Sequence, residues 1–185
     1  MRVSRSFHND QEIIMRFLDA LGEGSAIIPS NKRAGPGFFI FAHTFIHEYL
    51  DEIFFKKEEL LIKALSDDGF PDDDGPILIM RTEQGKSRDA AEHLINAAKG
   101  WQSGDEDARG EVSWAASEFT GIMRHHMEHL KNRILPLLEQ NISPEDEHRI
   151  AEGINAIVFE QGLQDDADKY IKLVAELEEE LKDWK

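Results

Sequence analysis

The stretch Phe54-Phe55-Lys56-Lys57-Glu58-Glu59-Leu60-Leu61 joins two aromatic residues to a pair of acids near the end of a long helical pattern. From about residue 38 to residue 65, apolar residues recur every three or four positions, and no glycine or proline interrupts them. A helix of this length spans roughly 40 Å. Taken alone, the two glutamates are typical of a solvated helix face, so their role depends on what lies opposite them.

The rest of the chain repeats this helical pattern between short breaks. Further helices are predicted over residues 6–21, 76–99, 111–138 and 144–184, the last divided at Gly162. Gly22 and Gly24 are expected to end the first helix, because glycine commonly follows a helix C-terminus. Turn-forming residues predict loops over residues 25–37, 66–75 and 100–110. The sequence therefore predicts an all-α protein.

The predicted architecture is an antiparallel up-down four-helix bundle, since long helices joined by short loops pack most simply in this way. We expect one domain over residues 1–185, with the core bundle at about 4–139 and an additional C-terminal helical segment at about 144–184. The sequence contains no alternating strand pattern and no glycine-rich phosphate loop. In such bundles, functional sites are built from side chains that point inward from facing helices.

The composition excludes several classes of function. With no cysteine, the chain can form neither disulfides nor thiolate metal sites. A net charge of -16 would repel a phosphate backbone, so no nucleic-acid partner is expected. No window approaches the roughly 18 apolar residues of a membrane span, and the N-terminus lacks the apolar core of a signal peptide. We therefore expect a cytoplasmic, acidic protein with no membrane partner.

Two pairs of histidines have the i, i+4 spacing that places both rings on one helical face: His43 with His47 and His125 with His129. Each pair could chelate a metal ion, but a pair alone lacks the third ligand and the orienting partners of a tight site. We therefore interpret each pair first as a half-exposed surface feature. His8 differs from these, because it lies beside apolar Phe7 near the start of the first predicted helix.

Four segments occur in an order and at a spacing that is more specific than any one of them. They are His8, residues 45–59 ending in Phe-Phe-Lys-Lys-Glu-Glu, residues 79–88 and residues 126–136. Together they resemble the hemerythrin-like, or HHE cation-binding, family, whose patterns in the last three segments are HHxKEE, MxxEHxxxR and HxxxE before a Leu-Pro pair. The resemblance covers most of the chain. It implies a four-helix bundle that holds a non-haem di-iron centre between its helices.

The chain departs from this family at positions that would bind metal. By the resemblance, family ligand positions fall on Phe54, Gln84 and Leu130, and the ligands that remain are His8, Glu58 and His126. A di-iron centre of the family's type uses more histidines and carboxylates than these three residues supply. A conventional di-iron centre is therefore not expected here.

Three interpretations of the remaining residues stay open. In the first, they hydrogen-bond one another, and the bundle is a metal-free interaction or sensory module. In the second, they bind a single divalent ion such as Fe(II), Mn(II) or Zn(II), with a fourth ligand from Glu59, Gln84, His125 or His129. In the third, shifted ligands such as Glu83 or His129 keep a dinuclear site, which requires local helix distortion because one residue turns a side chain by about 100°.

The function that the resemblance implies is binding of non-haem iron or another divalent metal within the bundle. Its expected role is in oxygen, nitric oxide or redox sensing, storage or repair, with the metal ion or a small diatomic molecule as partner. No catalytic grouping is evident, so a role other than that of an enzyme is favoured. Glu83 and Arg88 are expected at the surface or in support of ligands rather than in catalysis.

Overall fold

The computed structural model describes residues 2–163, 166 and 168–185, and this part of the chain is almost wholly helical, with no strand in it. The predicted all-α class is confirmed. Residues 164, 165 and 167, which fall in the predicted C-terminal segment, lie outside the described part. The elements in chain order are α1 (Arg2–Ile27), η1 (Ile28–Ser30), α2 (Pro36–Phe45), η2 (Ile46–Phe54), α3 (Phe55–Asp67), α4 (Gly75–Gln102), α5 (Ala108–His129), η3 (Leu130–Ile134), α6 (Leu135–Asn141), α7 (Pro144–Glu160) and α8 (Lys169–Trp184).

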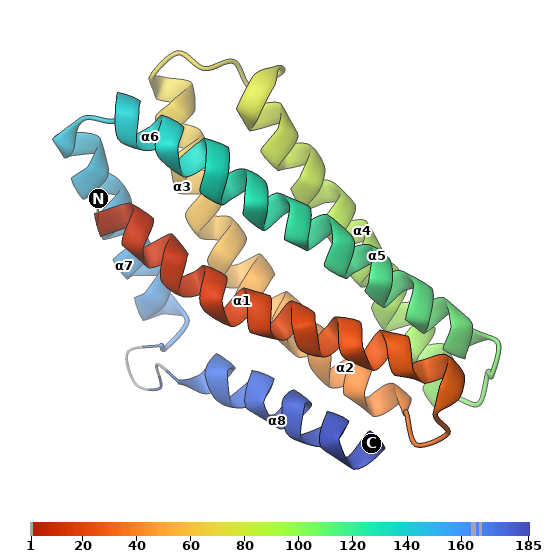
Figure 1. Ribbon diagram of the computed structural model, residues 1–185. Coiled ribbons are helices and arrows are strands. Elements are labelled where there is room, and N and C mark those ends of the chain that lie inside the picture. The colour runs from red at the N-terminus through yellow and green to blue at the C-terminus, as the bar shows by residue number, and fades with distance from the viewer. Residues whose placement is uncertain (1, 164–165, 167) are drawn as a thin grey trace.

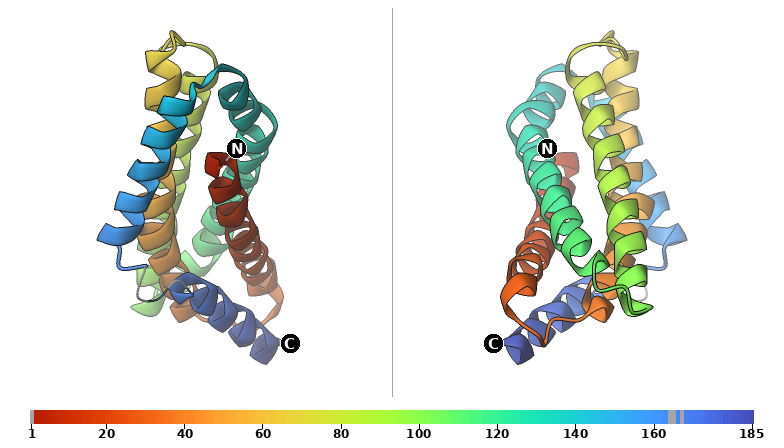
Figure 2. Two further views of the ribbon diagram at one scale, coloured as in Figure 1. Left: turned by 90° about the vertical axis from the view of Figure 1, so that its left-hand side faces the viewer. Right: turned by 90° about the vertical axis from the view of Figure 1, so that its right-hand side faces the viewer.

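Four long helical runs form the predicted up-down bundle (Figure 1). They are α1, the run from α2 through η2 to α3, α4, and the run from α5 through η3 to α6. α4 packs most extensively against α5, α1 also packs against α5, and α2 packs against α4. The additional C-terminal part is present as well: α7 lies along α3, and α8 lies against α1 and α2 at one end of the bundle (Figure 2). The described helices include no segment with the length and hydropathy of a membrane span.

α1 is longer than the sequence pattern predicts. It continues through Gly22 and Gly24 to Ile27, so the expected stop at these glycines is wrong. Gly24 serves instead as a point of close packing, because a Cβ atom there would lie 2.6 Å from Cε1 of the fully buried Phe38 ring. The missing side chain therefore lets α1 approach the start of α2.

The two glycines of α1 give a matched pair of substitutions. Gly24→Ala is expected to lower the free energy of unfolding by about 1–2 kcal/mol, because the ring of Phe38 must move within a packed core. Gly22→Ala is expected to raise it by up to about 1 kcal/mol, because alanine favours the helix and the nearest atom is 4.0 Å away. Urea unfolding of both variants measures the difference. Equal effects of the two changes would contradict the packing role of Gly24.

Two of the long helical runs contain wide turns. In η2 and η3 the backbone forms π-helix, and the N–H groups of Phe55 and Leu135 donate to carbonyls five residues earlier, those of Leu50 and Leu130. Pro136 gives a reason for η3, because proline has no N–H to donate and its ring crowds the preceding turn. Both runs were predicted as regular helices, and both distortions lie next to the residues of the candidate site.

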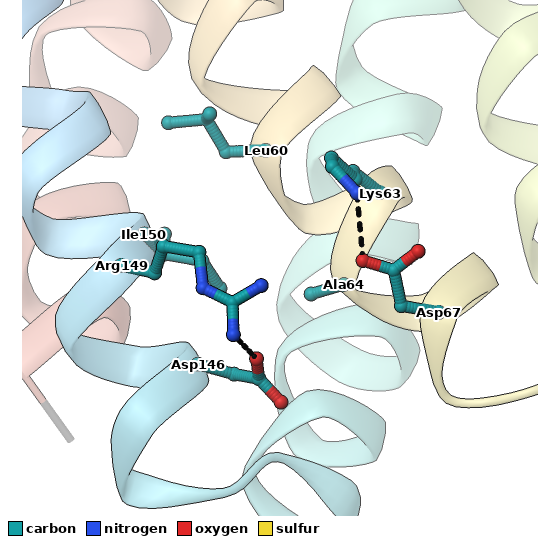
Figure 3. Close-up of a pocket in the computed structure, with 7 residues that line it drawn as sticks. All are labelled: Leu60, Lys63, Ala64, Asp67, Asp146, Arg149 and Ile150. Atoms are coloured by element: carbon teal, nitrogen blue, oxygen red, sulfur yellow. Dashed lines mark hydrogen bonds and ion pairs between the residues drawn. The ribbon is translucent and has the colours of Figure 1, made fainter.

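The joint between α3 and α7 contains a small recess (Figure 3). Apolar side chains, among them Leu60 and Ile150, line it together with the ion pairs Lys63–Asp67 and Arg149–Asp146. The recess measures about 50 Å³, room for one or two water molecules. It is therefore a packing feature of the joint rather than a ligand site.

Candidate functional site

A group of polar side chains lies in the interior of the bundle, where charged residues are rarely found unless they are paired. α3 supplies Glu58, which is 0% exposed, and α5 supplies His126, which is 1% exposed. α4 supplies the adjacent residues Glu83 and Gln84, both also buried. Glu58 follows η2 by four residues and His126 precedes η3 by four, so the wide turns flank this group along the chain.

The ring of His126 lies between two carboxylates. Its Nε2 atom is 2.7 Å from Oε2 and 2.9 Å from Oε1 of Glu58, and its Nδ1 atom is 2.8 Å from Oε2 of Glu83. The Nε2 amide of Gln84 donates a third hydrogen bond, of 2.9 Å, to Oε1 of Glu58. Because ionised carboxylates only accept hydrogen bonds, both ring nitrogens must carry protons to satisfy this arrangement. The arrangement fits an imidazolium cation at His126, held between two ionised carboxylates.

The electrostatics of the group agree with this protonation state. Burial alone lowers the pKa of His126, because it disfavours the charged ring. The charges of Glu58 and Glu83 and their hydrogen bonds to the ring together outweigh burial and raise the pKa to about 10. One positive charge thus lies between two acids, which is a stable arrangement only because all three groups are held in contact.

His129 extends the group by one helical turn of α5. Its Nδ1 atom lies 3.4 Å from Oε1 of Glu83, and within the described part of the chain neither atom has a hydrogen-bond partner although both are buried. Burial lowers the pKa of His129 more than the nearby Glu83 raises it. At this contact the hydrogen-bonding capacity of the group is left unsatisfied within the described residues.

Apolar side chains fill the space beside the polar group. Phe54 and Leu130, which occupy family ligand positions by the resemblance, are 0% and 2% exposed. The Phe54 ring meets that of Phe7 edge to face at 6.0 Å, and the Phe55 ring meets that of His126 in the same way, also at 6.0 Å. These residues make the surroundings of the group an ordinary hydrophobic core.

The structure brings together some of the site residues predicted from the sequence and leaves others apart. Glu58, Gln84, His126 and His129 belong to the buried group. His8 is exposed on α1, because Phe7 and Asp10 occupy its inward face. The predicted contact of His8 with Glu58 and His126 is therefore not formed. Glu59, His47 and His125 are exposed and lie outside the group. Glu59 pairs with Arg81 instead.

The sequence left the place of Glu83 open among several roles. The expected roles are a surface position, support of ligands or a shifted ligand. The structure excludes the surface position, because Glu83 is 7% exposed and contacts His126 directly. Its position next to Gln84, in the segment that resembles MxxEHxxxR, was the only signal for this role. The direction of its side chain depends on the facing of α4, which that signal does not specify.

A second buried polar group connects α1 to the run from η2 to α3. Lys57 Nζ lies 2.9 Å from Oδ2 of Asp10, and the hydroxyl of Tyr49 donates to Oδ1 of Asp10 at 2.5 Å. Burial raises the pKa of Asp10, and the charge of Lys57 acts in the opposite direction. Burial likewise raises the pKa of Tyr49, so its hydroxyl keeps its proton. No spacing in the sequence indicated this group.

Comparisons with known proteins identify the family. Among the residues that the structure describes, no group of three or more His, Cys, Asp or Glu side chains has the arrangement of a metal site. Searches of the curated proteins and of the solved structures gave no significant match. A family model, that of the hemerythrin HHE cation binding domain, matches residues 5–138. Together with the helical bundle, this match means that the chain belongs to the hemerythrin HHE cation-binding family.

Proposed function

We propose that this chain is a hemerythrin-family bundle that works without the family's dinuclear metal centre, as a metal-free interaction or sensory module. The observation that supports this is the position of His126, which is hydrogen-bonded at both ring nitrogens to buried carboxylates. A histidine binds metal through a nitrogen lone pair, and an imidazolium has none to offer. The protonated ring supplies the positive charge that a metal ion would otherwise bring to these acids.

The donor set does not fit two irons. Phe54 and Leu130 are apolar, and Gln84 offers at best a neutral amide oxygen that is a weak ligand for iron. The residues that could donate are two carboxylates, from Glu58 and Glu83, and two imidazoles. The two carboxylates lie on opposite sides of the His126 ring, so the four groups do not surround one point. These donors therefore do not support the oxygen chemistry of a dinuclear centre.

A second candidate function is the binding of one divalent ion by Glu83, His126 and His129. It is favoured by the two buried atoms without partners, Oε1 of Glu83 and Nδ1 of His129. Two imidazoles and one carboxylate are a donor set that suits Fe(II), Mn(II) or Zn(II). His126 would first have to lose a proton, so the affinity would rise with pH. A role in oxygen, nitric oxide or redox sensing belongs to this candidate.

Elemental analysis separates the two candidates. The protein is purified from iron- and manganese-supplemented medium without chelator or metal-affinity resin, and metal per chain is measured. We expect a value near zero, and no rise in melting temperature when Fe(II), Mn(II) or Zn(II) is added, because only a ligand of the folded state stabilises it. A value near one that is lost in His129→Gln but kept in His125→Gln would establish the second candidate. A value near two would contradict both.

A further inference from the structure

We propose that a surface pocket at the end of the bundle where α4 begins binds a small organic carboxylate with an apolar body. The pocket measures about 520 Å³, within the usual range for small-molecule sites. Its walls come from the first turns of α4, the loop before it, the end of α5, η3 and α6, elements that meet at one end of the bundle (Figure 1). This inference goes beyond the proposed function.

The pocket offers an apolar wall to a ligand. Phe70, Ile79, Pro136 and Leu137 contribute to its lining. Ile79 is 43% exposed, a large value for an isoleucine in a bundle whose other apolar residues are mostly buried. An apolar body that covered this side chain would remove it from water, which is favourable in proportion to the area covered. The wall therefore favours a ligand that is more than a bare inorganic ion.

The charge of the pocket is opposite to that of the chain. The protein has 37 acidic and 21 basic side chains, yet no carboxylate lines this pocket, and Arg133 does. Arg133 has no carboxylate partner in the described part of the chain; the arginines that do have one are Arg16, Arg81, Arg124 and Arg149. An exposed guanidinium at the edge of an apolar wall is complementary to an anionic head group.

The combination of features points to a carboxylate rather than to phosphate. The planar fork of an arginine binds two oxygens of either a carboxylate or a phosphate, so the apolar wall and the nearby charges decide between these ligands. A phosphate dianion would gain nothing from the apolar wall, and it would be repelled more strongly by Glu128. That residue lines an adjoining pocket together with His129 and Arg133. A neutral apolar molecule would cover Arg133 without supplying an acceptor, which is unfavourable.

His129 connects this pocket to the polar group in the core. It lines the pocket, while its Nδ1 atom is buried 3.4 Å from Oε1 of Glu83. Glu83 in turn is hydrogen-bonded to His126. A ligand that contacts the His129 ring therefore lies one side chain away from the buried group, and its binding is expected to shift the ring resonances of His129 in NMR spectra.

Calorimetric titration with octanoate tests the proposal, with octanamide and inorganic phosphate as comparison probes. We expect saturable binding of octanoate, weaker binding of octanamide and none of phosphate. Arg133→Gln is expected to weaken octanoate binding about tenfold, which corresponds to about 1.4 kcal/mol. The matched control is Lys131→Gln. Lys131 lies two residues before Arg133 and carries the same charge, but its side chain does not line the pocket. This substitution should change the affinity less than twofold.

Three results would overturn the proposal. One is the absence of saturable octanoate binding by the unmodified protein. Another is octanamide binding as tight as that of octanoate, since Arg133 would then have no role. The third is an equal loss of affinity in Arg133→Gln and Lys131→Gln, which would mean a general charge effect. Both substitutions are at exposed positions, and circular dichroism of each variant checks that its fold is intact.

Discussion

Replacing His126 with leucine is expected to lower the free energy of unfolding by about 3–5 kcal/mol at pH 7, the usual cost of removing one partner from a buried ionic group. Leucine fills much of the space of the imidazole, so the loss comes chiefly from charge rather than from a cavity. Glu58 and Glu83 would remain in the core with no cation between them. Urea unfolding followed by circular dichroism measures the change.

Two further variants separate this explanation from simple loss of packing. His126→Leu combined with Glu58→Gln and Glu83→Gln removes the whole ionic group at similar volume, and should recover most of the lost stability. His125→Leu, at the adjacent exposed position, should change the stability by no more than about 0.5 kcal/mol. A triple variant as unstable as His126→Leu alone would show that the charges do not cause the loss.

The same group gives the protein a specific dependence on pH. The pKa of His126 is raised from 6.5 to about 10 in the folded state. Its contribution to stability is therefore fully present below about pH 6.5 and is lost as the pH rises through about 10. Within that window the free energy of unfolding falls by up to about 1.4 kcal/mol per pH unit. His126→Leu should lack this part of the decline, so the difference between the two proteins should shrink as the pH rises.

Lys57→Met is expected to have the second large effect, a loss of about 3–5 kcal/mol at pH 7. It removes the cation from a buried pair in which Lys57 and Asp10 are 6% and 7% exposed, and leaves Asp10 with only the hydroxyl of Tyr49. Because the pKa of Asp10 is already raised by burial, loss of Lys57 raises it further. The loss should therefore shrink as the pH falls, because Asp10 takes up a proton and no longer needs a cation beside it.

The control for this prediction lies next to it in the chain. Lys56 pairs with Glu52 on an exposed face, so Lys56→Met should cost less than about 1 kcal/mol. Adding Asp10→Asn to Lys57→Met removes the unpaired charge and should restore part of the stability. Thermal unfolding at pH 4 and pH 7 tests both points. A loss in Lys57→Met that does not vary with pH would contradict the role of Asp10.

Hydrophobic periodicity was enough to predict the class and order of the helices, because each helix buries one continuous apolar face. Local signals also placed the start of α7, where the hydroxyl of Ser143 accepts from the N–H of Asp146, and its end before Gly162, which has a positive φ of 68°. The same kind of signal was wrong at Gly24, where the helix continues and the missing side chain makes room for the Phe38 ring. This contact depends on Phe38, which lies in another helix and outside the local sequence around Gly24.

The candidate site was predicted less completely, for a reason of geometry. The resemblance identified Glu58, Gln84 and His126, and these do meet in the core. It did not give the facing of each helix, and one residue of error turns a side chain by about 100°. His8 was lost in this way, because its neighbour Phe7 takes the inward direction. The same uncertainty left Glu83 with several possible roles.

The wide turn of η3 determines how the core continues beyond His126. Buried residues there recur at intervals of four, at His126, Leu130, Ile134 and Leu138. In a regular α-helix, each step of four residues rotates the side chain about 40° past a full turn around the helix axis. After a few such steps the side chains would no longer face the core. The wider turn of η3 offsets part of that rotation between Leu130 and Ile134, so the residues after the turn still face the core. Three aliphatic side chains thereby form a seam that continues from His126 toward the end of the bundle.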